Sequence, residues 1–246
     1  MPIDFLTFTP YDINYEKLMI GFEKQPIFDN EKLQRNYLNK WKTQLKSADN
    51  DLLRKMRNPS YLQKLIENFQ PHEKFQHKTN FNTGVSVLIN FVVEPLVQMA
   101  KSDQQYSQDV NLNKFSKELK LVTWTPPENQ KEDIEIKKEP IIFVHFYNAQ
   151  AFTYLLIDGN HRVANAIQQG KESIPSLIID PKEMIAGDYF LSKFDKLFFI
   201  FQNEIYYLYH CKTHYQMTDK ELLTRSYLSN QQFNFLDILP NLDLGK

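Results

Sequence analysis

The stretch PIIFVHFYNAQAFTYLLIDGNHRVANAIQQGKESIPSLIID, residues 140–180, carries the clearest structural pattern of the chain. Residues 140–147 are rich in β-branched and aromatic side chains, which favours a strand, and residues 153–158 favour a second strand after a short connection. Residues 161–170 place apolar side chains on one helical face and end in a glycine, so they predict a short helix. Residues 173–180 predict a third strand.

The order strand, helix, strand over residues 154–180 is long enough for a crossover connection. Pro175 stands near the start of the last strand and indicates that this strand begins at a sheet edge, because proline cannot donate a backbone hydrogen bond. We therefore expect a small sheet with at least one helix packed against it.

The chain on both sides of this stretch favours helices. Before it, Asn30 is a good cap for a segment whose apolar residues recur every four positions, and Pro59 separates that segment from a second candidate helix. After it, Ser192 and Thr218 each stand three residues before an acidic residue, which is the spacing of a capping box. The aromatic stretch 194–209 has helical spacing, with a β-hairpin as the alternative interpretation.

These patterns predict a mixed α/β (α+β) fold in which a small core carries large helical extensions. We expect a mostly helical N-terminal region over residues 1–138, the core over residues 139–182, and an aromatic-rich, mainly helical C-terminal region over residues 183–246. Residues 70–84 and 101–113 are polar and are expected to form loops.

Composition limits the classes of function. A hydrophobic content of 42% is ample for a packed core, and a formal net charge of −1 argues against a strongly cationic nucleic-acid binder, although a local basic patch stays open. The single cysteine excludes an internal disulfide and suits a reducing cytoplasm. The most apolar stretch, residues 85–100, is too short to span a bilayer and contains Asn90, Glu94 and Pro95. We expect a cytoplasmic protein with no membrane segment.

Asp158, Gly159, Asn160, His161 and Arg162 stand together where the second strand is expected to meet the helix. Gly159 allows a tight turn, and the first amides of a helix that begins near Asn160 have no intrahelical partner. Such a helix terminus attracts phosphate, and His161 and Arg162 add hydrogen-bond donors. Asp158 repels a bare phosphate, so it fits a magnesium ligand or a base that takes a proton from a hydroxyl group.

A structural interpretation competes with this site. Asp-Gly is a common turn, Asn160 is a good helix cap, His161 is a solvated first-turn residue, and Arg162 pairs with Asp158 on the surface. Each residue type taken alone fits that interpretation. The combination of all five at one strand-to-helix junction favours the phosphate site.

Residues 139–179, EPIIFVHFYNAQAFTYLLIDGNHRVANAIQQGKESIPSLII, resemble the core of the ParB/sulfiredoxin superfamily. The shared features are a Pro-Ile opening, a hairpin, an Asp-Gly-x-His-Arg turn, a helix that ends in glycine, and an Ile-Pro pair before a final strand. The superfamily includes CTP-binding partition proteins, sulfiredoxin and ADP-dependent free-serine kinases.

The resemblance implies that Gly159, His161 and Arg162 contact the phosphates of a nucleotide, usually with magnesium. Asp158 matches the acidic residue that precedes the glycine in the kinase-like members. Asn160 stands where sulfiredoxin-like members need a cysteine, so we do not expect that reaction. The sequence after the core is too aromatic to read as the helix-turn-helix region of the partition proteins.

We therefore expect a protein that binds a nucleotide (ATP, ADP or CTP, which the sequence does not distinguish) with Mg at residues 158–162, and we favour nucleotide hydrolysis or phosphoryl transfer as its activity. The candidate catalytic residues are Asp158 and His161, and Asp158 also serves the magnesium. The candidate phosphate ligands are Gly159, Asn160, His161 and Arg162, with His145 and Glu139 as candidate supporting residues.

Two other functions stay open. One is a DNA-binding or nuclease protein of the ParB type, related to partition or to mobile elements, and the other is a non-catalytic interaction module. The aromatic C-terminal region is either buried within the chain, which we favour, or a surface that forms a homodimer.

Overall fold

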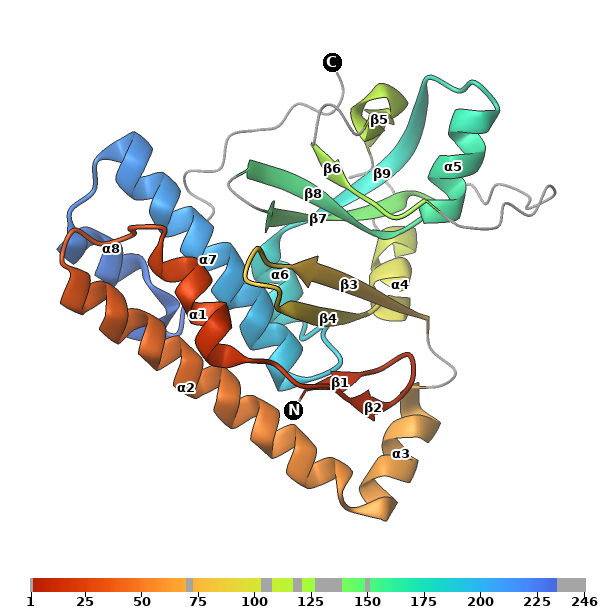
Figure 1. Cartoon of the computed structure of the whole chain (residues 1–246). Coiled ribbons are helices and arrows are strands. Elements are labelled where there is room, and N and C mark those ends of the chain that lie inside the picture. The colour runs from red at the N-terminus through yellow and green to blue at the C-terminus, as the bar shows by residue number, and fades with distance from the viewer. Residues whose placement is uncertain are drawn as a thin grey trace. The chain divides into compact units, whose positions relative to one another are not determined.

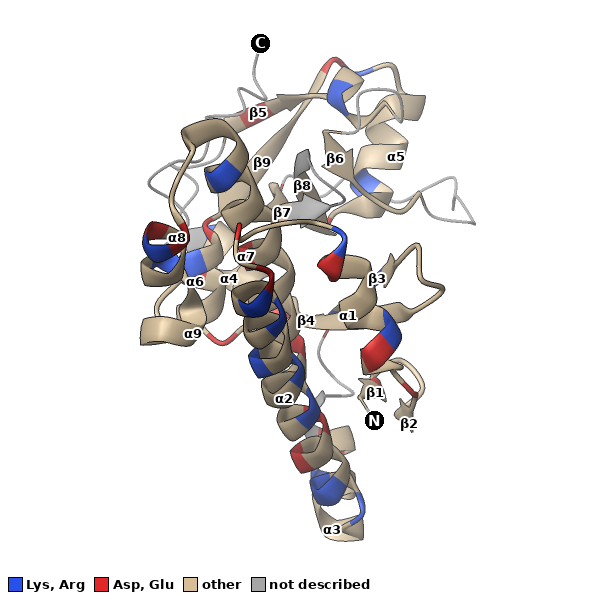
Figure 2. Cartoon of the chain, turned by 60° about the vertical axis from the view of Figure 1, so that its left-hand side comes forward, with Lys and Arg blue, Asp and Glu red and all other residues tan. Residues whose placement is uncertain are grey.

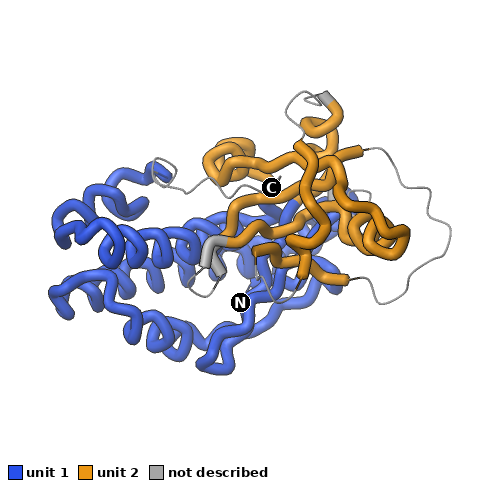
Figure 3. Tube along the Cα trace, turned by 90° about the horizontal axis from the view of Figure 1, so that it is seen from above, with its two compact units in different colours: residues 1–91, 190–239 blue, residues 92–189, 240–246 orange. Residues whose placement is uncertain are grey.

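The computed structural model describes residues 2–69, 73–102, 108–116, 121–126, 139–148 and 151–233. It combines helices with small sheets, which confirms the expected mixed α/β fold (Figure 1). The chain forms two compact units (Figure 3). Unit 1 consists of residues 1–91 and 190–239, and unit 2 consists of residues 92–189 and 240–246.

Unit 2 contains a five-stranded sheet in the order β5-β9-β7-β8-β6. The strands are β5 (Gln108–Asn111), β6 (Val122–Thr123), β7 (Ile141–Asn148), β8 (Ala151–Asp158) and β9 (Ser173–Ile179). The central strand β7 runs antiparallel to β8 and parallel to β9. The helix α5 (Asn160–Gln168) therefore joins two strands that lie on opposite sides of β7 and run antiparallel to each other.

Strand β7 is buried on both of its faces. Ile141 and Phe143 are fully buried on the face that packs against α5 and the 3-10 helix η2 (Leu112–Phe115). Ile142 and Val144 alternate with them and are also fully buried, and the helices α4 (Glu94–Ser102) and α6 (Pro181–Ala186) contact β7. The core against α5 consists of Val110, Leu112, Phe115, Ile141, Phe143, Tyr154, Leu156, Val163, Ala166 and Ile174.

Unit 1 is mainly helical. Its helices are α1 (Tyr15–Glu23), α2 (Glu31–Met56), α3 (Pro59–Phe69), α7 (Lys193–Tyr215), α8 (Asp219–Arg225) and α9 (Tyr227–Asn230). Its strands form two pairs, β1 (Ile3–Asp4) with β2 (Thr9–Pro10), and β3 (Lys74–Asn80) with β4 (Ser86–Val92). The two longest of these helices, α2 and α7, pack against each other (Figure 1).

The local helix signals are confirmed. Asn30, Ser192 and Thr218 are the N-cap residues of α2, α7 and α8, and each side chain accepts a hydrogen bond from a first-turn amide. The stretch 194–209 lies within one continuous helix, so the alternative hairpin is wrong. Its aromatic side chains Phe194, Phe198, Phe199, Phe201 and Tyr207 are buried, as we favoured, and the homodimer stays a prediction.

Several local predictions differ from the structure. Residues 70–84 and 101–113 were expected to be loops, but β3 and β5 lie within them, so the region 1–138 is less helical than expected. Strand β3 is polar and forms because it pairs with β4, whose Val87 and Ile89 are fully buried. The two compact units divide the chain at 91/92 and 189/190, and the three regions expected from the sequence, with boundaries at 138/139 and 182/183, stay a prediction. That division reflects contacts between segments far apart in sequence, which composition does not reveal.

We expected Pro175 to lie at a sheet edge, and this is true only of the first residues of β9. Strand β9 is an interior strand that lies between β5 and β7. Pro175 pairs with Asp109 of β5, whereas the pairing of β9 with β7 begins at Ser176. The proline therefore stands in the part of β9 that has a neighbour on one side, where its missing N–H leaves no ladder bond unmade.

In the part of the chain that the structure describes, each helix is either too short or too polar to cross a lipid bilayer.

Candidate functional site

The five residues of the Asp-Gly-Asn-His-Arg segment lie at a strand-to-helix junction, as expected. Strand β8 ends at Asp158, and α5 begins at Asn160. Gly159 is the N-cap residue and has a φ of 108°, in the left-handed region that favours glycine. The residue expected to cap the helix, Asn160, is instead its first residue.

Gly159 also lies unusually close to strand β7. A Cβ atom at this position would come within 2.4 Å of Cγ2 and 2.8 Å of Cβ of Ile141. Because both the backbone conformation and this approach exclude a side chain, glycine is required here for two independent reasons. The close approach holds the start of α5 against the start of β7.

Arg162 ties the same two elements together through polar contacts. Its Nη2 donates to Oδ2 of Asp158, and its Nη1 donates to the backbone oxygens of Glu139 and Pro140, the latter at 3.0 Å. The side chains of Arg162 and Asp158 are only 11% and 13% exposed. The pair is therefore a largely buried brace, not the surface pair that the structural interpretation assumed.

The ion pair leaves some N–H groups of Arg162 and one carboxylate oxygen of Asp158 without a partner among the described residues. Arg162 has five N–H donors, and its contacts with Asp158, Glu139 and Pro140 use three of them. Within the described residues, Nε and the second N–H of Nη2 have no acceptor, and Oδ1 of Asp158 has no donor. A ligand at the junction can thus contact both side chains without breaking their ion pair.

The N-terminus of α5 lacks the side-chain cap that other helices of the chain have. At α1, α2, α6, α7, α8 and α9 the N-cap side chain accepts from a first-turn amide, whereas Gly159 has no side chain to do so. The amides of Asn160, His161 and Arg162 find no acceptor among the described residues. They are oriented donors at the positive end of the helix dipole.

The other two members of the segment differ in exposure. Asn160 is half-buried, and its Oδ1 accepts a hydrogen bond from the backbone N–H of Thr125 at 3.0 Å. That bond brings the chain that follows β6 to the start of α5. His161 is exposed at the first turn, where its ring is accessible to a ligand.

The two expected supporting residues behave differently. Glu139 is brought to the junction by its backbone oxygen, which Arg162 contacts, while its carboxylate pairs with Lys101 at 3.2 Å. His145 pairs across the sheet with Tyr154, four residues before Asp158, which places it about 13 Å along the strand from the junction. Burial lowers the pKa of His145. The structure therefore does not bring His145 to the other candidate residues.

The described residues contain no cluster of three or more His, Cys, Asp and Glu side chains that is arranged to hold a metal ion. A Mg²⁺ at the junction would have Asp158 as its carboxylate ligand and would need oxygens from a ligand as well, which is how Mg²⁺ is commonly held beside phosphates. The rings of His210 and His214 lie 4.3 Å apart on α7, with Cys211 between them in the sequence, but these three residues do not form such a cluster.

Unit 1 holds a buried carboxylate that the sequence did not single out. Glu204 of α7 is fully buried, and its Oε1 accepts from Oη of Tyr37 at 2.5 Å, Nε1 of Trp41 at 3.1 Å and Oγ of Ser226 at 2.8 Å. Its Oε2 accepts from the backbone N–H of Tyr227 at 2.6 Å. Burial raises the pKa of Glu204. The available signal was an acid inside the run KLFFIFQNEIYYLYH, which consists mainly of aromatic and aliphatic residues.

Comparison of the chain with protein-family models, with curated proteins and with solved structures gives no match. The resemblance to the ParB/sulfiredoxin superfamily accordingly depends on residues 139–179 alone.

Proposed function

We propose that unit 2 binds the phosphates of a magnesium nucleotide at the junction of β8 and α5. The observation that carries the proposal is the uncapped start of α5, where Gly159 has a left-handed conformation and the next three amides have no acceptor within the part of the chain that the structure describes. Backbone amides at a helix N-terminus bind phosphate through both hydrogen bonds and the helix dipole. The exposed ring of His161 adds a donor at the same place.

The roles of the two charged residues follow from their contacts. Arg162 holds the junction together and uses its remaining donors on phosphate, while Oδ1 of Asp158 serves the magnesium ion or takes a proton from the attacking hydroxyl. This arrangement favours hydrolysis or phosphoryl transfer over simple binding, because the free carboxylate oxygen lies beside the proposed phosphate position. His161 is then a phosphate ligand and a candidate proton donor.

Asn160→Asp tests the phosphate site. The new carboxylate keeps an oxygen for the N–H of Thr125 and adds a negative charge at the start of α5. Because acids stabilise helix N-termini by about 0.3–1 kcal/mol, the ligand-free variant should melt at the same or a higher temperature than the parent. Binding of ATP, ADP, CTP or GTP, measured by calorimetry with and without Mg²⁺, should weaken by roughly tenfold or more because the charge repels phosphate.

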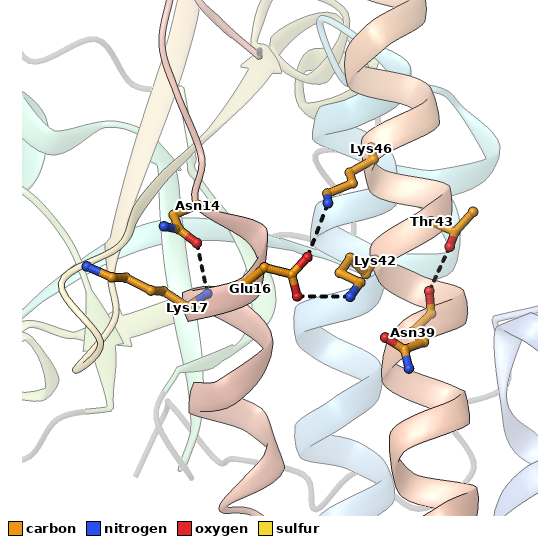
Figure 4. Close-up of polar contacts among 7 residues, drawn as sticks. All are labelled: Asn14, Glu16, Lys17, Asn39, Lys42, Thr43 and Lys46. Atoms are coloured by element: carbon orange, nitrogen blue, oxygen red, sulfur yellow. Dashed lines mark hydrogen bonds and ion pairs between the residues drawn. The ribbon is translucent and has the colours of Figure 1, made fainter.

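Asn14→Asp is the matched control. Asn14 caps α1 in unit 1, where its Oδ1 accepts from the backbone N–H of Lys17 at 3.0 Å (Figure 4). The same charge change at that helix should leave nucleotide affinity unaltered. The proposal fails if none of the four nucleotides binds the parent, or if Asn160→Asp binds them as the parent does.

A second candidate function is DNA binding, and it is supported by one observation. Exposed cations of α2 are Lys32, Arg35, Lys40, Lys46, Arg54 and Lys55, of which Lys46 pairs with Glu16 and Arg54 pairs with Asp51. Figure 2 shows that Lys and Arg residues are spread along this helix. Cations along one helix can contact successive phosphates, and such binding weakens steeply as salt rises. A gel-shift series with duplex DNA at increasing salt separates this function from the first, because nucleotide binding at α5 needs no cation of α2.

A further inference from the structure

Helices α2, α8 and α9 enclose a groove within unit 1. One end of the groove is a cavity of about 350 Å³, whose apolar lining comes from Leu33, Leu223 and Leu228. The hollow continues along α2 as a shallower space of about 690 Å³ that shares Leu33 and Leu228 and extends to Gln44. The result is an elongated groove with leucines at one end and amide and hydroxyl groups along the other.

The floor of the groove is rigid. Tyr37 and Ser226 line it, and both donate to the buried carboxylate of Glu204. Movement of either side chain into the groove would leave Glu204 short of a donor in a buried site, which is costly. These two hydrogen bonds favour a preformed floor, which would reduce the ordering that a ligand needs on binding.

The wall that α2 contributes has the spacing of a helix-packing seam. Leu33, Asn36, Lys40 and Gln44 are separated by three, four and four residues, so they lie on one face of α2. Asn36 and Lys40 are exposed, and Leu33 is half-buried. A face of this period accepts the side chains of a second helix laid along the groove.

Lys40 gives the groove its charge. It is the one charged side chain that lines either part of the groove among the described residues, and it forms no ion pair with them. Lys42 and Lys46 on the neighbouring face differ, because both pair with Glu16, at 3.0 and 3.3 Å (Figure 4). The groove thus presents an unpaired cation next to leucines.

We propose that this groove binds an acidic amphipathic helix of a partner protein. Leucine-like side chains of the partner would cover Leu33, Leu223 and Leu228, and a carboxylate would pair with Lys40. A nucleic acid fits the groove less well, because Lys40 is the one cation that lines it among the described residues and half-buried leucines give a phosphate backbone nothing to contact. The proposal is independent of the nucleotide site, which lies in unit 2.

The test uses the full chain and a fluorescent helical peptide of about fourteen residues, with leucine on one face and glutamate on the other. Anisotropy should show saturable binding. Binding should be lost with a scrambled peptide of the same composition, which has no apolar face, and should weaken about tenfold with a peptide that carries lysine in place of glutamate. Lys40→Glu should weaken binding of the glutamate peptide about tenfold and should improve binding of the lysine peptide.

Lys64→Glu is the control, because Lys64 is an exposed cation of α3 that lies outside the groove and the substitution changes net charge equally. The Lys64→Glu variant should bind the glutamate peptide with the same affinity as the parent. Both exchanged side chains are exposed, so both variants should melt as the parent does. Equal losses in the two variants, or equal binding of the scrambled peptide, would overturn the proposal. Self-association of the parent that Lys40→Glu abolishes would also overturn it, since the occupant would then be a second copy of the chain.

Discussion

The guanidinium of Arg162 and the carboxylate of Asp158 form an ion pair across one turn at the start of α5, and each side chain is nearly nine-tenths buried. The same guanidinium holds the backbone oxygens of Glu139 and Pro140 at the start of β7. One arginine thus connects a strand end, a helix start and the loop before the central strand. Substitutions at this pair should affect stability as well as any ligand.

Arg162→Ala should lower the free energy of unfolding by about 3–5 kcal/mol, because it leaves a largely buried carboxylate without its cation. Asp158→Ala should also destabilise, and the double variant should lose less than the sum, with a coupling of about 1–3 kcal/mol. Urea unfolding of the four proteins measures this cycle. Additive losses would show that the two side chains do not stabilise each other.

Asp158→Asn separates the stabilising role of this residue from its proposed chemical role. The amide keeps the side-chain shape and an oxygen for Arg162 but removes the negative charge. Metal-free nucleotide should bind as well as it binds the parent, or better, while magnesium dependence and any turnover should be lost. Calorimetry with and without Mg²⁺ and a phosphate-release assay measure the two effects. Unchanged magnesium dependence in the folded variant would remove Asp158 from the proposed metal site.

Gly159→Ala should destabilise the protein strongly for two reasons. The backbone conformation costs about 1–3 kcal/mol for a residue with a side chain, and the new methyl group would overlap Ile141, which costs about 1–3 kcal/mol more. Gly170→Ala is the control, because Gly170 also has a positive φ, of 65°, but has open space where the methyl group would lie. Thermal melting should rank the parent first, Gly170→Ala second and Gly159→Ala last. Equal melting temperatures for the two variants would mean that the contact with Ile141 is unimportant.

A substitution of Glu204 that removes only the charge should destabilise the protein less than one that also removes the side-chain oxygen atoms. Glu204→Gln keeps an acceptor for Tyr37, Trp41 and Ser226 but turns an N–H group toward the amide of Tyr227, so we expect a loss of about 1–3 kcal/mol. Glu204→Leu leaves four buried donors unpaired and should lose considerably more, or fail to fold. Chemical unfolding checks the order. A leucine variant as stable as the glutamine variant would show that the donors find water instead.

The pH dependence of stability should contain a contribution from Asp195. This buried residue of α7 accepts from the backbone and side-chain N–H groups of Asn90 and from Oγ of Ser192. Burial raises its pKa to about 7 from an ordinary value of 3.8. Between these values the folded chain holds a proton that the unfolded chain has released, so stability should fall as pH rises from about 4 to about 7.

Asp195→Asn removes this titration, so the parent and the variant should differ in the slope of melting temperature against pH within that window. The pKa of His77 is lowered by burial, and its contribution runs the other way, because it is lost as pH falls. His77 is present in both proteins, so the comparison isolates Asp195. Parallel curves from pH 4 to 8 would contradict a raised pKa for this carboxyl group.

The local sequence was sufficient to predict the helix caps and the strand-to-helix junction, because these features depend on neighbouring residues. Asn30, Ser192 and Thr218 mark the starts of α2, α7 and α8 because a cap needs only the residue itself and the next few amides. The junction of β8 with α5 was likewise predictable from the Asp-Gly pair and the change of hydrophobic period around it. The residues of the candidate phosphate site, 158–162, are contiguous in sequence, so a local pattern is sufficient to mark them.

Tertiary structure decided what those residues contact. The acceptors of Arg162 include backbone oxygens that lie 22 and 23 positions earlier in the chain, and Glu204 meets Tyr37 and Trp41 across separations of 167 and 163 residues. Strand β3 exists because β4 lies beside it, although its own residues are polar. Which residues become partners depends on how the helices and strands pack. Packing depends in turn on the whole unit, and a short window of sequence does not contain that information.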